Sequence, residues 1–234
     1  MVTPARPAQA LFNPVLKSKD KLHIDVFKSP KHPGAICVAN YKGGVGKTTV
    51  ACLLGYYLAE TTKKRVLLID IDPQCSLSLA LGFDLEVVNK TELTIYNLVK
   101  PSKWTKIKKT DFSSYVDSAP DRFAPKGLFV IKGSFEVEDL DMEIAKSTVG
   151  EQARRVDEFF LYCKQMLYSF DDYEYVIVDC PPNKMFLTQG MLRACSYFLP
   201  VTIPDVISIY GMPRLLRGSN KYRSGIDPGC SATF

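Results

Sequence analysis

The chain has 234 residues, of which 46% are hydrophobic, and it carries a formal net charge of +5. This length fits one α/β domain with extensions, and the apolar content is sufficient for a full core. No apolar run approaches the length of a membrane span, and no signal-peptide core follows the basic residues at the N-terminus. We therefore expect a cytoplasmic protein with no membrane partner. The mildly basic charge permits contact with nucleic acid but does not indicate it by itself.

The seven cysteines are scattered along the chain and include no C-x-x-C pair. Several of them lie inside apolar runs, where buried thiols are common. We therefore expect reduced thiols of a cytosolic protein rather than a disulfide or zinc framework.

The sequence divides into three segments. Residues 1–33 are rich in proline and lysine and predict a basic, solvated N-terminal arm, with an electrostatic contact to DNA or to a partner as the alternative. Residues 34–218 contain alternating strand and helix patterns, which indicate a single domain. Residues 219–234 are polar and contain glycine, which predicts an irregular C-terminal tail.

A glycine-rich loop between two apolar segments is the most informative stretch of the chain. Ile36–Ala39 has the composition of a buried parallel strand, and a helix is predicted from about Thr48 to Glu60. Glycines in the loop let the backbone adopt φ > 0 and direct its N–H groups toward one centre, where the positive end of the helix adds to their attraction for phosphate oxygens. These glycines are Gly43, Gly44 and Gly46.

Two side chains at the start of that helix have the chemistry of a nucleoside triphosphate site. Lys47 stands where a phosphate-binding lysine is required, and the hydroxyl of Thr48 is placed to bind Mg²⁺. A plain glycine loop would not need this lysine and threonine at this spacing. The stretch therefore predicts a site for a nucleoside triphosphate and its magnesium ion.

Carboxylates follow two further apolar strands. Val66–Ile69 leads to Asp70 and Asp72, and Tyr175–Val178 leads to Asp179. The carboxyl end of a strand beside a phosphate loop is where Mg²⁺ and water are handled in α/β proteins. Charged turns or a helix cap would also explain single aspartates, but two aspartates around one apolar residue favour the site.

The remaining patterns complete an α/β domain. The spacing of apolar residues predicts a doubly wound, mostly parallel sheet flanked by helices, with the ligand at the carboxyl edge. Trp104, beside Lys106, Lys108 and Lys109, reads as an aromatic anchor on a solvated face, with nucleic-acid contact as the alternative. Further helices are expected at 77–81, 93–98, 152–170, 185–194 and 206–216, and strands at 128–131 and 198–203.

The three motifs KGGVGKTT, LLIDIDPQ and VIVDCPP together resemble the ParA/Soj-type partition ATPases, which belong to the deviant Walker-A group of P-loop proteins. The resemblance runs from about Ala35 to Leu216 and is specific in the three motifs. After Asp-Pro-Gln the family often has Gly-Asn, whereas this chain has Cys75 and Ser76. The family also adds at least one strand and one or two helices beyond the point where this sequence ends.

The resemblance implies a role for each matching position. Lys42 matches the signature lysine that reaches the phosphates of the partner subunit, and Asp72 matches the residue that orients the attacking water. Lys47, with Lys42 and Asp72, would carry catalysis, while Thr48, Asp70 and Asp179 would hold Mg²⁺, the two carboxylates acting through water. The phosphate loop corresponds to Gly43, Gly44, Val45, Gly46, Lys47, Thr48 and Thr49, with Lys42 before it.

The function implied by the resemblance is an ATP switch with slow intrinsic turnover. Such a protein forms a homodimer on ATP, binds DNA without sequence preference, and is switched off by hydrolysis under a ParB-like activator during plasmid or chromosome partition. It would then be associated with the nucleoid.

Three other classes remain as alternatives. The first is a nucleotide-binding regulator or scaffold without efficient hydrolysis. A MinD-like positioning ATPase requires a C-terminal amphipathic helix, and residues 217–234 offer no apolar face. An electron-transfer iron protein requires paired cluster cysteines, and no second ligand is indicated beside Cys180.

Overall fold

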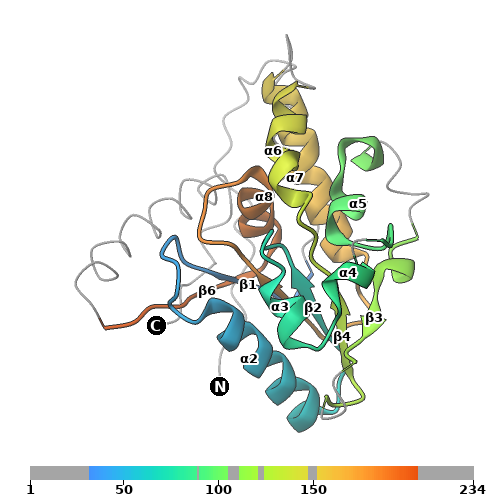
Figure 1. The fold of residues 1–234 in the computed structure, drawn as a ribbon, viewed down its shortest axis with the longest axis vertical. Helices are drawn as coiled ribbons and strands as arrows, with labels where there is room; N and C mark the ends of the chain where they lie inside the picture. The colour runs from blue at the N-terminus through green and yellow to red at the C-terminus, as the bar shows by residue number, and fades with distance from the viewer. Residues whose placement is uncertain (1–31, 89, 105–110, 121–123, 147–151, 205–234) are drawn as a thin grey trace, which may run out of the picture.

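A six-stranded sheet forms the centre of the computed structural model, in the order β3-β4-β2-β5-β1-β6 (Figure 1). All neighbouring strands pair in parallel except β3, which runs antiparallel to β4. The strands are β1 (Ala35–Ala39), β2 (Val66–Asp70), β3 (Asp117–Ser118), β4 (Leu128–Ile131), β5 (Tyr175–Asp179) and β6 (Tyr197–Pro200). The structure describes residues 32–88, 90–104, 111–120, 124–146 and 152–204.

Helices cover both faces of the sheet, as the doubly wound prediction requires (Figure 1). One face is covered by α2 (Lys47–Thr62) and α3 (Ser76–Ala80). The other face is covered by α5, α6, α7 and α8. The other helices are α4 (Leu85–Val88), α5 (Ile95–Val99), α6 (Val137–Lys146), α7 (Gln152–Tyr168), α8 (Phe186–Ala194) and the 3₁₀ turn η2 (Ser113–Tyr115).

Side-chain alternation along β2 divides the core into two apolar clusters. Leu67 and Ile69 pack with the helices α5–α8, whereas Leu68 packs with α2. All three side chains are fully buried. A strand that is apolar on both faces has the pattern of a central parallel strand, which is why the sequence predicted β2 correctly.

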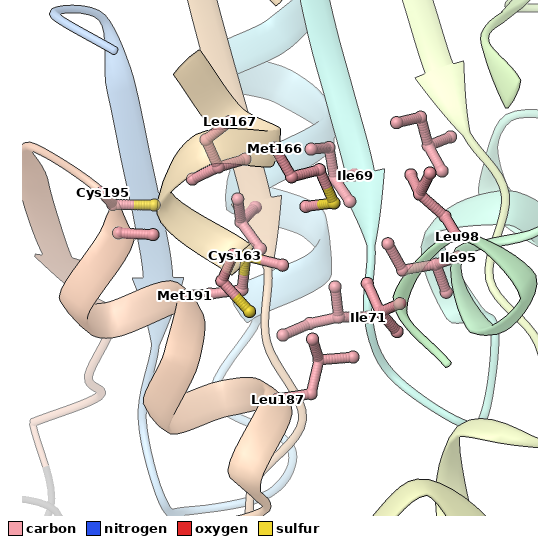
Figure 2. Packing of buried hydrophobic residues seen from close by; sticks show 14 of the residues in the cluster. Ile69, Ile71, Ile95, Leu98, Cys163, Met166, Leu167, Leu187, Met191 and Cys195 are labelled. Carbon is pink, nitrogen blue, oxygen red and sulfur yellow. The ribbon is translucent and has the colours of Figure 1, made fainter. Parts of the chain in front are cut away.

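Helices α7 and α8 approach each other closely at Gly190. A Cβ atom added there would lie 2.8 Å from the Sγ atom of Cys163 and 3.2 Å from Cε1 of Phe159. Figure 2 shows Cys163 of α7 beside Met191 of α8, and Met166 of α7 beside Ile69 of β2 in the same cluster. The glycine therefore allows two helices to pack at short range over the sheet.

The predicted elements are confirmed except at a few places. The expected strand 198–203 ends at Pro200. Helix α6 was not predicted, although Val137, Leu140 and Ile144 have helical spacing and are fully buried. Strand β3 has two residues and is defined by its pairing with β4, so local sequence carries no signal for it. The helix expected at 206–216 lies outside the described residues.

Trp104 is an aromatic anchor, as predicted. Its side chain is 7% exposed, its indole N–H donates to the carbonyl of Val99 at 2.9 Å, and its ring lies 5.1 Å from that of Phe159. This burial leaves no ring face for a nucleobase. The neighbouring lysines at 106, 108 and 109 lie outside the described residues.

His32 is buried, with its ring nitrogens 3.0 Å from the carbonyl oxygen of Phe170 and 3.1 Å from the backbone N–H of Gly34. The three proposed segments stay a prediction. The described cysteines, at 37, 52, 75, 163, 180 and 195, are not joined in disulfides. In the part of the chain that the structure describes, no helix has both the length and the apolar character to cross a bilayer.

Candidate nucleotide site

Three neighbouring strands bring the sequence motifs together at one edge of the sheet. Strand β5 lies between β1 and β2, so the glycine loop after β1 and the aspartates after β2 flank the end of β5. Asp70 and Asp179 are direct register partners, and Val38 of β1 pairs with Asp179 on the other side. Chain segments far apart in sequence therefore meet because of the strand order.

The glycine loop has the backbone geometry expected for phosphate binding at two of its three glycines. Gly44 has φ +70° and Gly46 has φ +89°, and Gly46 is the N-cap of α2. A side chain at either position would strain the backbone. Gly43 does not adopt a positive φ, so that part of the prediction was wrong; a Cβ atom there would meet nothing within 4 Å.

Asn40 fixes the start of this loop. Its side-chain amide donates to the carbonyl of Val201 at 2.7 Å, and its Oδ1 atom accepts the backbone N–H of Lys42 at 3.0 Å. Val45, within the loop, is 5% exposed and packs into the α2 side of the core. Sequence analysis missed Asn40; a buried polar residue directly after an apolar strand was the available signal.

Lys47 lies at the start of α2 with its side chain held inside the loop. Its Nζ atom donates to the backbone carbonyl of Lys42 at 3.1 Å. Burial lowers the pKa of Lys47, while the negative charges of Asp179 and Asp72 oppose that shift. The ammonium group is therefore held at the loop, and the nearby carboxylate charges partly offset the cost of burying it.

Asp179 is a buried carboxylate whose oxygens lack hydrogen-bond partners. Its side chain is fully buried, and neither Oδ1 nor Oδ2 is paired among the described residues. Burial raises the pKa of Asp179 to about 7; the Thr48 hydroxyl lies near enough to oppose this rise, though not in good hydrogen-bond geometry, and the charge of Asp70 adds to it. A native structure rarely leaves both oxygens of a buried carboxylate unpaired, so this group is available for a ligand.

Asp70 is equally buried but well partnered. The backbone N–H and the hydroxyl of Ser78 both donate to its Oδ2 atom, at 2.8 Å and 2.7 Å, and the N–H of Asp72 donates to Oδ1 at 3.2 Å. Burial raises the pKa of Asp70 to about 6, against the lowering effect of these hydrogen bonds. The two register partners therefore have different environments.

Asp72 lies at the beginning of the turn that leads into α3. It is 8% exposed, and its Oδ1 atom accepts the N–H of Gln74 at 2.9 Å. Cys75, where the resembling family often has glycine, adopts φ +52°, a conformation that glycine takes more easily. Asp72 is thus fixed by its own turn, and its negative charge opposes the lowering of the Lys47 pKa.

Within the described residues, no three His, Cys, Asp or Glu side chains lie close enough together to hold a metal ion by themselves. Mg²⁺ in phosphate sites keeps several of its waters and uses one or two carboxylates together with substrate phosphates. The unpaired, buried carboxylate of Asp179 beside Thr48 fits such a partly hydrated ion. Lys47, Thr48, Asp70, Asp72 and Asp179 are brought together; Thr49 is exposed and Lys42 half-buried on the loop.

The fold and this constellation define a P-loop protein: a glycine loop between a parallel strand and a helix, with carboxylates on the adjacent strands. A protein-family model described as AAA domain matches residues 34–228. Soj, a chromosome-partitioning ATPase of Treponema pallidum, is 33% identical over 194 residues, which cover 82% of this chain and 66% of that relative. The chain belongs to this AAA-domain family, and ParA of Caulobacter vibrioides, a chromosome-partitioning protein, is a further relative at 31% identity over 196 residues, covering 82% of this chain and 64% of that relative.

Solved structures share the fold. The cobyrinic acid a,c-diamide synthase of Mycobacterium smegmatis, solved with bound ADP and magnesium, has a TM-score of 0.66 at 24% identity, covering 84% of this chain and 70% of that one. A plasmid partition protein of Borrelia burgdorferi has a TM-score of 0.64 at 19% identity, covering 84% and 76%. The chain spans 66% of the length of the Soj relative, and 47% and 43% of two further curated relatives.

The pKa of Asp179 predicts how the stability of the ligand-free protein depends on pH. An acid whose pKa is raised by folding favours the folded state when protonated, so its contribution is lost as pH rises from about 4 to about 7. An Asp179→Asn variant removes this group, and its free energy of unfolding at pH 8 should exceed that of the wild type by roughly 2–4 kcal/mol. Urea unfolding at pH 5 and pH 8, with EDTA present, measures the difference.

Asp171→Asn is the matched control, because Asp171 is an exposed carboxyl group. This control should follow the wild type at both pH values. Parallel stability profiles for the wild type and Asp179→Asn would contradict the conclusion that Asp179 is buried and unpaired.

Proposed function

We propose that this chain binds ATP with Mg²⁺ at the carboxyl edge of the sheet and hydrolyses it slowly. The positive φ of Gly44 and Gly46 and the position of Lys47 support phosphate binding at the start of α2. The observation that carries the proposal is the buried Asp179 carboxylate, unpaired beside Thr48. The solved synthase with ADP and magnesium has the same fold and supports this choice of ligands.

Each residue of the site has a distinct part in this proposal. The backbone of residues 43–49 and the ammonium of Lys47 bind the phosphates, and Thr48 holds the metal ion with its hydroxyl. Asp70 and Asp179 hold the ion's water ligands. Bound Mg²⁺ would supply positive charge against the phosphate oxygens during transfer. Asp72 orients the attacking water, for which its fixed turn and its charge interaction with Lys47 are suited.

Lys42 gives the proposal its regulatory step. We assign it to the phosphates of a partner subunit, so that ATP holds two copies face to face and hydrolysis releases them. In the described chain its backbone is fixed by Asn40. Because the charge that completes the site then comes from another copy, dimerisation and turnover are coupled.

We further propose that the ATP-bound homodimer binds DNA without sequence preference and is stimulated by a ParB-like adaptor during plasmid or chromosome partition, on the nucleoid. The family of the chain and its net charge of +5 support this. A nucleotide-binding regulator without efficient hydrolysis would share the ligand but not the turnover.

A Lys42→Ala substitution tests the dimer. The wild-type chain, of 26.2 kDa, should double its mass with ATP and Mg²⁺ but remain a monomer without nucleotide or with ADP. The variant should stay a monomer in all three conditions because the partner's phosphates lose their cation. Size-exclusion chromatography with light scattering measures this. An ATP-dependent dimer that persists in the variant would contradict the role of Lys42.

Retention on DNA tests whether the ATP-bound protein binds DNA. Non-specific DNA should retain the protein with ATP and Mg²⁺, and retention should fall by roughly ten-fold or more between 50 and 200 mM salt if several phosphates are contacted. A filter-binding or fluorescence-anisotropy titration with duplexes of unrelated sequence measures it. Equal retention with ATP, with ADP and without nucleotide would rule out the partition role.

An Asp72→Ala substitution separates binding from chemistry. It should abolish ATP turnover while ATP affinity is maintained, because Asp72 is assigned to the water and not to the phosphates. Phosphate release and titration with a fluorescent ATP analogue measure the two quantities. Asp171→Ala, on the exposed surface, is the control and should leave both unchanged. Unchanged hydrolysis in Asp72→Ala would show that another group orients the water.

A further inference from the structure

We infer that Ser78 is a positioning residue for the metal site. It fixes the carboxylate of Asp70 so that only one acceptor site, on Oδ1, is left for a water bound to the ion. This inference rests on the proposed binding of Mg²⁺ and nucleotide. Ser78 does not belong to any of the three motifs from which the function was predicted, and it lies on the short helix α3. Its hydrogen bonds join α3 to the ends of β2 and β4.

The hydrogen bonds of Asp70 divide its two oxygens. A carboxylate oxygen accepts about two hydrogen bonds. Oδ2 accepts two, from the backbone N–H and the hydroxyl of Ser78, so it is saturated. Oδ1 accepts one, from the N–H of Asp72, and keeps one acceptor site. Asp70 can therefore accept one hydrogen bond from a metal-bound water, and the direction of that bond is set.

The proton of the Ser78 hydroxyl is also fixed in direction. The backbone N–H of Gly133, just after β4, donates to Ser78 Oγ at 2.9 Å. Since an N–H can only donate, Oγ accepts there and must use its own proton toward Asp70 Oδ2, which lies 2.7 Å away. Ser78 is itself fully buried, so no solvent competes for these bonds. The result is a chain of hydrogen bonds from the end of β4 to the end of β2.

Gly133 provides an independent sign that this contact is closely fitted. A Cβ atom at this position would lie 2.9 Å from Asp70 Oδ2 and 2.9 Å from the Sγ atom of Cys75. No side chain fits there without moving the carboxylate. The backbone of the loop after β4 thus limits where the Oδ2 atom of Asp70 can lie.

Asp179 provides the contrast. Its oxygens have no hydrogen-bond partner among the described residues, whereas its register partner Asp70 accepts three hydrogen bonds, two from Ser78 and one from Asp72. The carboxylate of Asp179, which can adjust, and that of Asp70, which is fixed, therefore lie on neighbouring strands. We assign to Asp70 the task of orienting the ion's waters. Loss of a group that orients a metal-binding carboxylate lowers metal affinity by about 10–100-fold.

Nucleotide titrations on the full chain test this assignment. The probe is a fluorescent ATP analogue, titrated in EDTA and at increasing Mg²⁺, and the spectrum of Mn²⁺ bound in place of Mg²⁺ reports its surroundings directly. In Ser78→Ala the Mg²⁺ concentration at half-saturation should rise about ten-fold or more. Affinity in EDTA should be unchanged. Ser78→Thr, which keeps the hydroxyl, should lie close to the wild type.

Two glycine variants keep the test decisive if Ser78→Ala folds poorly. Gly133→Ala crowds Asp70 and should weaken Mg²⁺ dependence as Ser78→Ala does. Gly190→Ala introduces a similar close contact, 2.8 Å from Cys163 Sγ, in the core between α7 and α8. It should lower the urea concentration at the midpoint of unfolding and leave the half-saturating Mg²⁺ concentration unchanged.

The outcomes separate the inference from the proposed function. A wild-type half-saturation in Ser78→Ala and Gly133→Ala would overturn the role of Ser78 while leaving the nucleotide site in place. A Ser78→Thr variant as weak as Ser78→Ala would overturn the role of the hydroxyl. A wild-type protein that binds no nucleotide, or binds it equally with and without Mg²⁺, would overturn the proposed function and this inference with it.

Discussion

Burial of like charges at the carboxyl edge of the sheet is the constraint on which the rest of this structure depends. Asp70 and Asp179 are fully buried register partners, and desolvation raises the pKa of both. Burying these carboxylates lowers the stability of the ligand-free fold. The burial of two apolar clusters, on opposite faces of the sheet, compensates for this loss of stability. Binding of a cation would relieve the repulsion, so the same feature that weakens the free protein favours the ligand.

The two aspartates illustrate how a fold can give identical side chains different tasks. Asp70 is directed by Ser78 and the N–H of Asp72, so its orientation belongs to the protein. Among the described residues Asp179 has no such hydrogen-bond partners, so its carboxylate can adjust to what binds. A hydrated ion bound here would meet one carboxylate that the protein holds fixed and one that can adjust to it.

Most of the fold followed from the sequence because its signals are local. Apolar strands such as β2 and β5, and the long helix α7, are recognised from composition and spacing, and the glycine loop from its residue types. The partners of Asp70 could not be predicted, because Ser78 and Gly133 meet only through the strand order β4-β2. Strand β3 and the contact of Asn40 with the end of β6 are non-local in the same way. The unlike environments of the aspartates therefore required the tertiary structure.

The resting place of the Lys47 ammonium has a consequence for which molecules can enter. Its Nζ atom is bonded to the carbonyl of Lys42, within its own loop. An anionic oxygen arriving there exchanges a neutral acceptor for a charged one, and charge-assisted bonds are the stronger kind. A bare nucleoside has nothing to offer in that exchange and would leave the ammonium where it was. The loop thus selects ligands by their phosphate chain rather than by their base.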